Sequence, residues 1–401
     1  MSTVAPFTHD EHFDSSRTRR MQGVSFVFGF ADAFLVYILS SYFESATGSY
    51  NVSLFYLVAY GIIFALLFLI PRWARTIGVS SLLLVLLSLV LACIAPLSIV
   101  AVSFGGTALI VGYLIVSTLA WVSMDIVLEG FSEDRRSGRI RGAYLTVMNL
   151  GILLAPFLAT ITLSRFGFSG VFLAGFLGFS VLVLSAISAV SGVNRKLRDL
   201  RLPLDVVRNA LRRPDVLRVY AISFAMECFY AVMIVYTTLH LRNIGLSWDE
   251  IGVVFTAMLL PFVIVQYPLG RLADRRFGEK ELIILSLFIA GSATMLVPFV
   301  SGTSVLLWSV ILFLTRLGIA GVEVLRDSYF FKRIDKEDGD LIAFFRTARP
   351  LANIVSAAIV GLWLFAFSLP SVFFIPAIIL FLAIIPAFLL EDNVSEQEMT
   401  A

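Results

Sequence analysis

Hydrophobic residues in this chain come in long stretches of about 20 residues, separated by short polar segments. Within a stretch they neither alternate with polar residues nor keep to one helical face, so half-buried strands and amphipathic surface helices are disfavoured. A helix of about 20 residues can cross the hydrocarbon core of a bilayer. We predict membrane-spanning helices at 21–42, 50–70, 79–98, 103–124, 140–163, 169–192, 217–241, 250–269, 281–299, 303–324, 342–365 and 370–390.

The composition supports this interpretation. Hydrophobic residues make up 59% of the 401 positions and charged residues 14%, and the mean hydropathy is +0.93. A soluble protein would need polar helix faces that these stretches lack. Because lipid offers no hydrogen-bond partners to peptide groups, each span must be helical. We therefore expect an all-α membrane protein with twelve transmembrane helices.

Lys and Arg are distributed unequally between the two sides of such a helix array. Of the 30 Lys and Arg residues, all except Arg165, Arg242 and Arg316 fall in the segments on the side of the N-terminus. Cytoplasmic segments carry the excess of positive charge, so this distribution places both termini in the cytoplasm. We expect a multi-pass protein of the cell (inner) membrane.

The longest polar interval between spans divides the chain into six helices and six helices. The expected parts are a tail at 1–20, a first bundle at 21–192, a linker at 193–216, a second bundle at 217–391 and a tail at 392–401. The halves correspond at a spacing of about 200 residues, because ARTIG at 74–78 lies opposite DRRFG at 274–278. This repeat predicts two pseudo-symmetric six-helix bundles.

The loop after the eighth span carries the clearest motif. Residues 270–280 read GRLADRRFGEK, which resembles the loop signature Gly-x-Leu-Ala-Asp-Arg-x-Gly-Arg-Lys of the major facilitator superfamily. One extra residue precedes Gly278, and Glu279 replaces a basic position. The resemblance covers the whole chain in its helix count and its basic central linker, and it implies a transporter that works by alternating access.

The resemblance also implies a cytoplasmic gate around this loop. Gly270 permits close helix contact, Gly278 permits a turn at positive φ, and Asp274 can face a helix N-terminus in the other half. Arg275 is expected to pair with Glu323 or Asp327, and in the first half Arg75 with Asp125 or Glu129. A solvated turn that only obeys the charge rule is the alternative.

A second motif lies in the fifth span, GILLAPFLAT at 151–160. It is in register with an antiporter signature of the same superfamily at Gly151 and Pro156, with Ala155 at a later glycine position. Small residues allow close helix packing and proline bends a helix, so ordinary packing beside a kink is the alternative.

Three ionisable residues fall near the middle of predicted spans: Asp32, Glu227 and Arg316. Such residues are costly in a membrane and often mark a substrate or proton pathway. Tyr37, Tyr230 and Tyr236 lie at similar levels and are candidates to line a pocket. The alternatives are a carboxyl held only for packing and a structural salt bridge for Arg316. His240, at the outer end of its span, is expected to be a surface histidine.

The sequence contains no phosphate-binding glycine loop, no metal-ligand spacing and no nucleophile–base arrangement. We therefore expect no enzyme activity, no cofactor other than the proton as coupling ion, and no nucleic-acid partner. The favoured function is proton-coupled efflux of an amphipathic small molecule by a monomer in the lipid bilayer, with Asp32 or Glu227 carrying the proton. The alternatives are a symporter or uniporter of a sugar or organic anion, a lipid flippase, and a non-transporting receptor.

Overall fold

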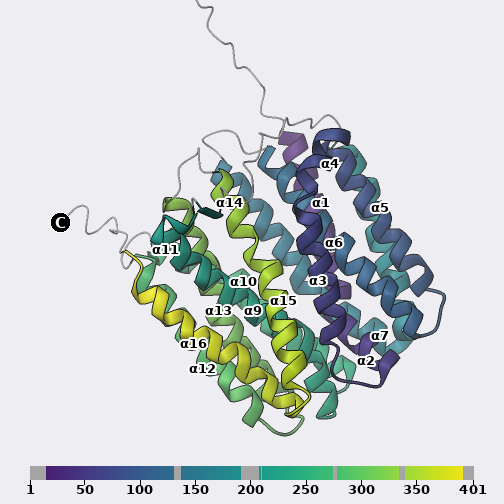
Figure 1. The fold of residues 1–401 in the computed structure, drawn as a ribbon. Coiled ribbons are helices and arrows are strands. Elements are labelled where there is room, and N and C mark those ends of the chain that lie inside the picture. The colour runs from purple at the N-terminus through teal and green to yellow at the C-terminus, as the bar shows by residue number, and fades with distance from the viewer. Residues whose placement is uncertain are drawn as a thin grey trace, which may run out of the picture.

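A computed structural model of the chain describes residues 15–130, 137–190, 207–208, 210–273, 278–333 and 339–391. Every regular element in these ranges is helical (Figure 1). The helices of the first half are α1 (Ser15–Val36), α2 (Leu39–Thr47), α3 (Ser53–Leu67), α4 (Ile70–Ile77), α5 (Val79–Leu97), α6 (Phe104–Gly130) and α7 (Ser137–Val190).

The second half, drawn from teal through green to yellow in Figure 1, repeats this arrangement with more interruptions. Its elements are α9 (Pro214–Asn243), α10 (Trp248–Ile264), α11 (Gln266–Leu272), α12 (Lys280–Leu296), η2 (Val297–Phe299), α13 (Val305–Arg333), α14 (Gly339–Arg346), α15 (Ala348–Trp363), η3 (Leu369–Phe373) and α16 (Phe374–Phe388).

These helices confirm the twelve predicted spans. Among the described residues, nine helices are long and apolar enough to cross a membrane, and the bent pair of α3 and α4 forms a tenth span. The long helix α7 counts once in that number but turns back at Gly167, so it supplies two spans. The 16-residue helix α15 completes the set. The protein is therefore an all-α, multi-pass membrane protein.

Prolines explain where three of the spans are broken. Proline lacks an N–H, and its ring clashes with the carbonyl four residues earlier. Helix α3 ends at Leu67, four residues before Pro71, and α10 ends at Ile264, four before Pro268. In the same way α14 ends four residues before Pro350. The breaks at Pro71 and Pro268 occupy equivalent places in the two halves, each just before the loop of the predicted gate.

The two halves contact each other through three helix pairs: α7 with α10, α3 with α15, and α2 with α9. Hydrogen bonds between the halves run from Thr238 Oγ1 to the Tyr37 carbonyl (2.8 Å), Tyr50 Oη to Asn243 Oδ1 (2.9 Å), Asn51 Nδ2 to the Gly361 carbonyl (3.1 Å) and Ser164 Oγ to Asp249 Oδ2 (3.4 Å). All of these residues lie toward the helix ends remote from the chain termini. The halves are therefore closed against each other on the side predicted to be outside.

Gly167 makes the sharp reversal within α7. Its φ of 64° and ψ of −169° belong to a region that residues with a β-carbon essentially avoid. We expect Gly167→Ala to destabilise the protein by roughly 1–3 kcal/mol and to lower the midpoint of thermal unfolding in detergent. Gly61→Ala is the matched control, because Gly61 lies within helix α3 and has open space where the added β-carbon would lie. Equal midpoints for the two variants would contradict this role.

Candidate functional site

Asp32 is held by two donors from a single neighbouring helix. The Tyr113 hydroxyl donates to Oδ1 and the Trp121 indole N–H donates to Oδ2, each at 2.9 Å. Both donors lie on α6, eight residues apart and so on one helix face. The Trp121 ring in turn stacks on Phe28 at 4.2 Å between centroids. This clamp lies entirely within the first half, and it holds the half-buried carboxyl in one orientation.

Arg316 is the least compensated charge among the described residues. Its side chain is 1% exposed, and none of its three guanidinium nitrogens has a hydrogen-bond partner in the described ranges. Its guanidinium carbon lies 4.8 Å from the centre of the Phe229 ring and 5.6 Å from that of Tyr230. The Tyr37 hydroxyl also lies within electrostatic range. Aromatic faces therefore surround this cation, but no anion does.

Tyr230 connects the surroundings of Arg316 to a carboxyl. Its hydroxyl lies 3.4 Å from Glu323 Oε2, which also accepts a hydrogen bond from Gln266 Nε2 at 3.1 Å. Glu323 was expected beside Arg275 in the cytoplasmic gate. That pairing lies outside the described residues and stays a prediction, but the carboxylate itself contacts two neutral donors from α9 and α11.

Arg326 lies one turn further along α13. It forms an ion pair with Asp327 (3.1 Å between Nε and Oδ1), donates to Ser223 Oγ, and lies over the ring of Phe345. Asp327, the other expected partner of Arg275, is thus already paired with a neighbouring arginine. The Arg326 charge also lies within electrostatic range of Glu227 and Glu323.

Arg349 is the functional residue that sequence reasoning missed. It was assigned to the cytoplasmic charges at the start of a span, yet its charge interacts with Glu227 in its own half and with Asp32 and Asp125 in the other half. Its side chain is nevertheless exposed. Arg349 is therefore an exposed cation within electrostatic range of acidic groups from both halves. Its place in the motif RTARP gave no signal of this, because only the packing of α15 against α3 brings it inward.

Tyr37 and Tyr236 lie further toward the closed side. Tyr37 occupies the break between α1 and α2, where its carbonyl accepts from Thr238 and its ring contacts Phe255 at 5.3 Å. Tyr236 lines a small pocket with Ser53 and Tyr56 of α3 and with Asn353 and Ser356 of α15. Both tyrosines are buried. Of the predicted pocket residues, Arg316, Tyr37 and Tyr230 are therefore brought together, Glu227 lies toward Arg349, and Tyr236 lines a separate small pocket.

In the described part of the gate loop, Gly278 has the positive φ that its turn requires, whereas Gly270 leaves room for a β-carbon. Gly270 lies on α11, and a β-carbon there would lie 3.7 Å from Val324 of α13. Gly278 has a φ of 70° and donates to the Ala273 carbonyl at 3.0 Å, which closes a turn. Asp274 and Arg275 lie outside the described residues, as does the side chain of Glu129. The pairing of Arg75 with Asp125 or Glu129 stays a prediction.

Glu279, which departs from the superfamily signature, has a compensating partner. Its side chain is 1% exposed and its Oε1 accepts from Lys332 Nζ (2.5 Å) and Ser328 Oγ (2.8 Å). Both partners lie at the end of α13. The acid at the usual basic position is therefore matched by a base on the neighbouring helix.

The fifth-span motif makes a close helix contact. A β-carbon at Gly151 would lie 2.5 Å from the Phe26 carbonyl of α1, and Ala155 is fully buried. Pro156 lies within α7. The motif thus allows α1 and α7 to pack closely, whether or not the protein is an antiporter.

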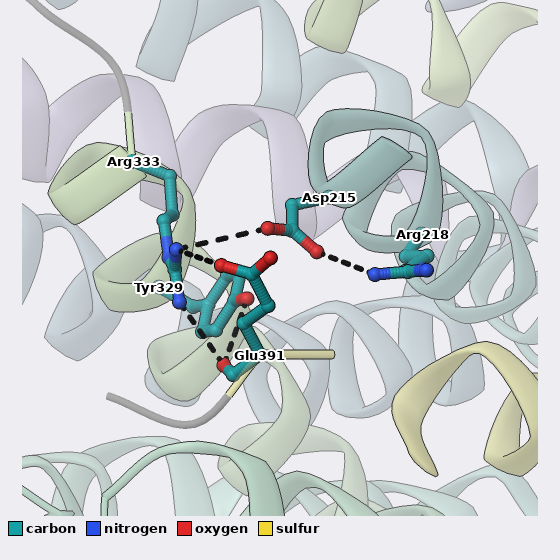
Figure 2. Close-up of polar contacts among 5 residues, drawn as sticks. All are labelled: Asp215, Arg218, Tyr329, Arg333 and Glu391. Carbon is teal, nitrogen blue, oxygen red and sulfur yellow. Dashed lines mark hydrogen bonds and ion pairs between the residues drawn. The ribbon is translucent and has the colours of Figure 1, made fainter. Parts of the chain in front are cut away.

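A further charged cluster lies at the ends of the second-half helices (Figure 2). Arg333 is 2.7 Å from a Glu391 carboxylate oxygen and 3.7 Å from one of Asp215, and Arg218 is 2.8 Å from the other Asp215 oxygen. The Tyr329 hydroxyl donates to the Glu391 carbonyl at 3.0 Å. The cluster joins the start of α9, the end of α13 and the segment after α16, so it fastens these ends into one body.

His240 is not the surface residue that was expected. It is 1% exposed and its ring contacts those of Trp308 and Phe373, each at 5.3 Å between centroids. The expectation of a surface histidine was wrong because the outer end of α9 lies beneath α13 and η3.

The Asp32 clamp can be tested by double-mutant cycles. Tyr113→Phe and Trp121→Phe each leave one carboxylate oxygen without its donor, which we expect to cost roughly 1–3 kcal/mol. Each should therefore lower the midpoint of thermal unfolding. In an Asp32→Leu background the same substitutions should cost much less, because the acceptor is gone. If the cost is the same in both backgrounds, the hydrogen bonds do not stabilise the protein.

The Glu279–Lys332 pair can be tested by exchanging its charges. Glu279→Lys restores the basic residue of the superfamily signature but places two cations together. We expect it to lower the free energy of unfolding by about 3 kcal/mol. This is the lower end of the range for a buried pair, because Lys332 is half-exposed. The double variant Glu279→Lys/Lys332→Glu should recover most of the lost thermal stability. A double variant no more stable than Glu279→Lys would show that the pair does not join α12 to α13.

Comparison with known proteins identifies the fold. The family model of the Major Facilitator Superfamily matches residues 220–399. A solved structure described as a POT family transporter in complex with 5-aminolevulinic acid superposes with a TM-score of 0.73 at 12% identity, over 93% of this chain and 95% of that chain. At that identity the likeness shows the fold alone.

One curated relative is the probable galactarate/D-glucarate transporter GudP of Bacillus subtilis (strain 168). It is 33% identical over 145 residues, which are 34% of this chain. The match spans about a third (31%) of the length of that relative. Together with the family model and the fold, it confirms the resemblance that the loop motif suggested.

Proposed function

We propose that this chain, which has the fold of the Major Facilitator Superfamily, is a secondary transporter that moves a small organic anion across the membrane by alternating access, coupled to protons. It works as a monomer in the lipid bilayer and needs no cofactor. The proposal selects the organic-anion alternative of the sequence analysis over efflux of an amphipathic molecule, because an uncharged or cationic substrate would leave Arg316 without an anion.

Arg316 carries the proposal. A buried charge without a partner costs several kcal/mol, and contact with aromatic faces returns only about 2 kcal/mol. An arginine retains its proton even when buried, so it cannot escape this cost by becoming neutral. A planar guanidinium with all its N–H groups free matches a carboxylate, which it binds through two parallel hydrogen bonds. Substrate binding thus supplies the counter-charge that the folded protein lacks.

The relatives support a carboxylate substrate. Galactarate and D-glucarate are sugar acids with a carboxylate at each end, and 5-aminolevulinic acid carries one carboxylate. Two carboxylate groups on one small molecule would find two cations here, since Arg349 is exposed and lies within electrostatic range of Glu227 and Asp32.

Proton coupling follows from the charge of such a substrate. Moving an anion into a cell against a negative interior costs about 2.3 kcal/mol per charge for each 100 mV. Protons that travel with the anion cancel this charge. Asp32 and Glu227 are half-buried and lie near Arg349, so they are the carboxyls that we propose to load and release protons.

The closed contact between the halves supports alternating access. The hydrogen bonds of Tyr37, Tyr50 and Asn51 to the second half seal the side remote from the termini. Opening that side requires these bonds to break while the gate around Asp274 closes the other side. Substrate bound between the halves is then exposed to one side at a time.

Arg316→Met tests the anion site. Purified protein in liposomes with an inward proton gradient should accumulate D-glucarate or another sugar acid in preference to a neutral sugar and a hydrophobic cation. The substitution should reduce apparent affinity at least about tenfold, since hydrogen bonds to charged groups contribute roughly 1.5–3 kcal/mol. The ligand-free variant should be as thermally stable as the wild type or more so, because an uncompensated charge has been removed.

Arg165→Met is the control, because Arg165 is exposed at the helix ends remote from the chain termini. It should retain wild-type transport. If Arg316→Met lowers the thermal midpoint and leaves transport intact, Arg316 has a structural role. If the wild type accumulates only the hydrophobic cation, the organic-anion assignment is wrong.

A further inference from the structure

We propose that Tyr230 couples anion binding at Arg316 to the protonation of Glu323. Its hydroxyl group can donate one hydrogen bond, either to the Glu323 carboxylate or to the substrate. This inference rests on the proposed function and adds a positioning residue and a third coupling carboxyl to it. The residues come from α9 and α13, so the coupling takes place within the second half and does not need the two halves to move.

The geometry places Tyr230 between the two charges. Its ring centre lies 5.6 Å from the Arg316 guanidinium carbon, and its hydroxyl oxygen lies 3.4 Å from Glu323 Oε2. A carboxylate bound to Arg316 therefore lies beside the Tyr230 ring. The distance to Glu323 is long for a hydrogen bond between an O–H and an ionised carboxylate, which prefers 2.5–2.7 Å. Tyr230 is therefore not firmly held by Glu323.

A hydroxyl has one proton to donate, and this makes the two acceptors compete. When Glu323 is ionised, Tyr230 donates to it and has no proton left for the substrate. When Glu323 takes up a proton, the carboxyl becomes a donor, and the Tyr230 oxygen can accept from it while donating to the substrate carboxylate. The proton that enters stays on Glu323 and no covalent bond changes. Anion binding and proton uptake therefore strengthen each other, equally in both directions.

Within the described ranges, the other charged groups around Glu323 do not satisfy it in place of Tyr230. On its own helix, Arg326 pairs with Asp327 at 3.1 Å and donates to Ser223. On α9, Glu227 is a like charge that opposes ionisation of Glu323, and from α11 the contact is the neutral Gln266. Arg326 is thus the cation in electrostatic range, and it is shared between acids.

Asp32 differs from Glu323 in its hydrogen-bond donors. Each Asp32 oxygen accepts from a neutral donor at 2.9 Å, and both donors belong to the first half. Neither of these donors is also in contact with Arg316. Protonation of Asp32 therefore reaches the anion only through space, whereas Glu323 reaches it through a shared hydroxyl.

The test is the pH dependence of the apparent affinity for D-glucarate, measured as the KM of uptake and as thermal stabilisation by added ligand. For the wild type, KM should fall as the pH falls, because protonated Glu323 leaves Tyr230 free to donate. Tyr230→Phe should have a KM raised about tenfold at low pH, because one hydrogen bond to a charged group is lost, and this KM should depend less on pH than that of the wild type. Its maximal rate should change little.

Glu323→Gln mimics the protonated carboxyl. It should bind D-glucarate with nearly the low-pH affinity at every pH and should exchange internal for external substrate. A proton gradient should drive less accumulation than in the wild type, because only Asp32 and Glu227 remain to carry protons. Glu323→Asp should recover part of the gradient-driven uptake. Tyr220→Phe is the matched control: Tyr220 also lies on α9, but its hydroxyl contacts Thr347, and we expect the wild-type pH profile.

Two outcomes overturn the inference alone: a KM of Tyr230→Phe that falls as steeply with falling pH as that of the wild type, or gradient-driven accumulation by Glu323→Gln equal to that of the wild type. Folding of each variant is checked by its thermal midpoint without ligand, so a misfolded variant is recognised and the more conservative Glu323→Asp decides. If the wild type neither binds nor moves D-glucarate or another organic anion, the proposed function fails and this inference with it.

Discussion

The cost of taking a charged group out of water governs the interior of this protein. Asp32, Glu323 and Arg326 all meet that cost with hydrogen bonds or an opposite charge within reach. Arg316 does not, although it is as deeply buried as any of them. The protein places one phenol donor and one indole donor on the Asp32 carboxyl, so its fold is able to supply partners for a buried charge. The unpaired guanidinium is therefore best explained by a partner that arrives from outside the chain.

The backbone obeys the same constraint at the places where helices break. Each proline break removes a hydrogen bond that lipid cannot replace. Breaks before Pro71 and Pro268 lie next to the loops of the predicted gate, and the break in the first span at Tyr37 is closed by the Thr238 hydroxyl of the other half. These three interruptions thus lie where the two halves would part and meet under the proposed alternating access. The cluster around Arg333 shows the reverse case, since it joins helix ends within the second half (Figure 2).

The two halves have similar arrangements of helices, but the charged residues of the candidate site are distributed unequally between them. The first half holds one fully satisfied carboxyl, Asp32, whereas the second holds Arg316, Glu323, Arg326 and Arg349. Glu279 shows how such divergence is tolerated: the loop signature lost a base, and Lys332 on the adjacent helix supplies one. Compensation of this kind keeps the scaffold intact while the binding residues change.

Hydropathy and the placement of Lys and Arg determined the helix count, the two-part organisation and the glycine turns, because these depend on local sequence alone. They also singled out Asp32, Glu227 and Arg316, since an ionisable residue inside an apolar stretch is visible without any structure. Partners could not be found in this way. Tyr113 and Trp121 are ordinary aromatic residues until α6 packs beside α1, and Arg349 looked like one more cytoplasmic charge until α15 carried it between the halves. Whether a charged group has a hydrogen-bond partner depends on side chains far away in the sequence. Only the tertiary structure therefore decided that Arg316 has no such partner among the described residues.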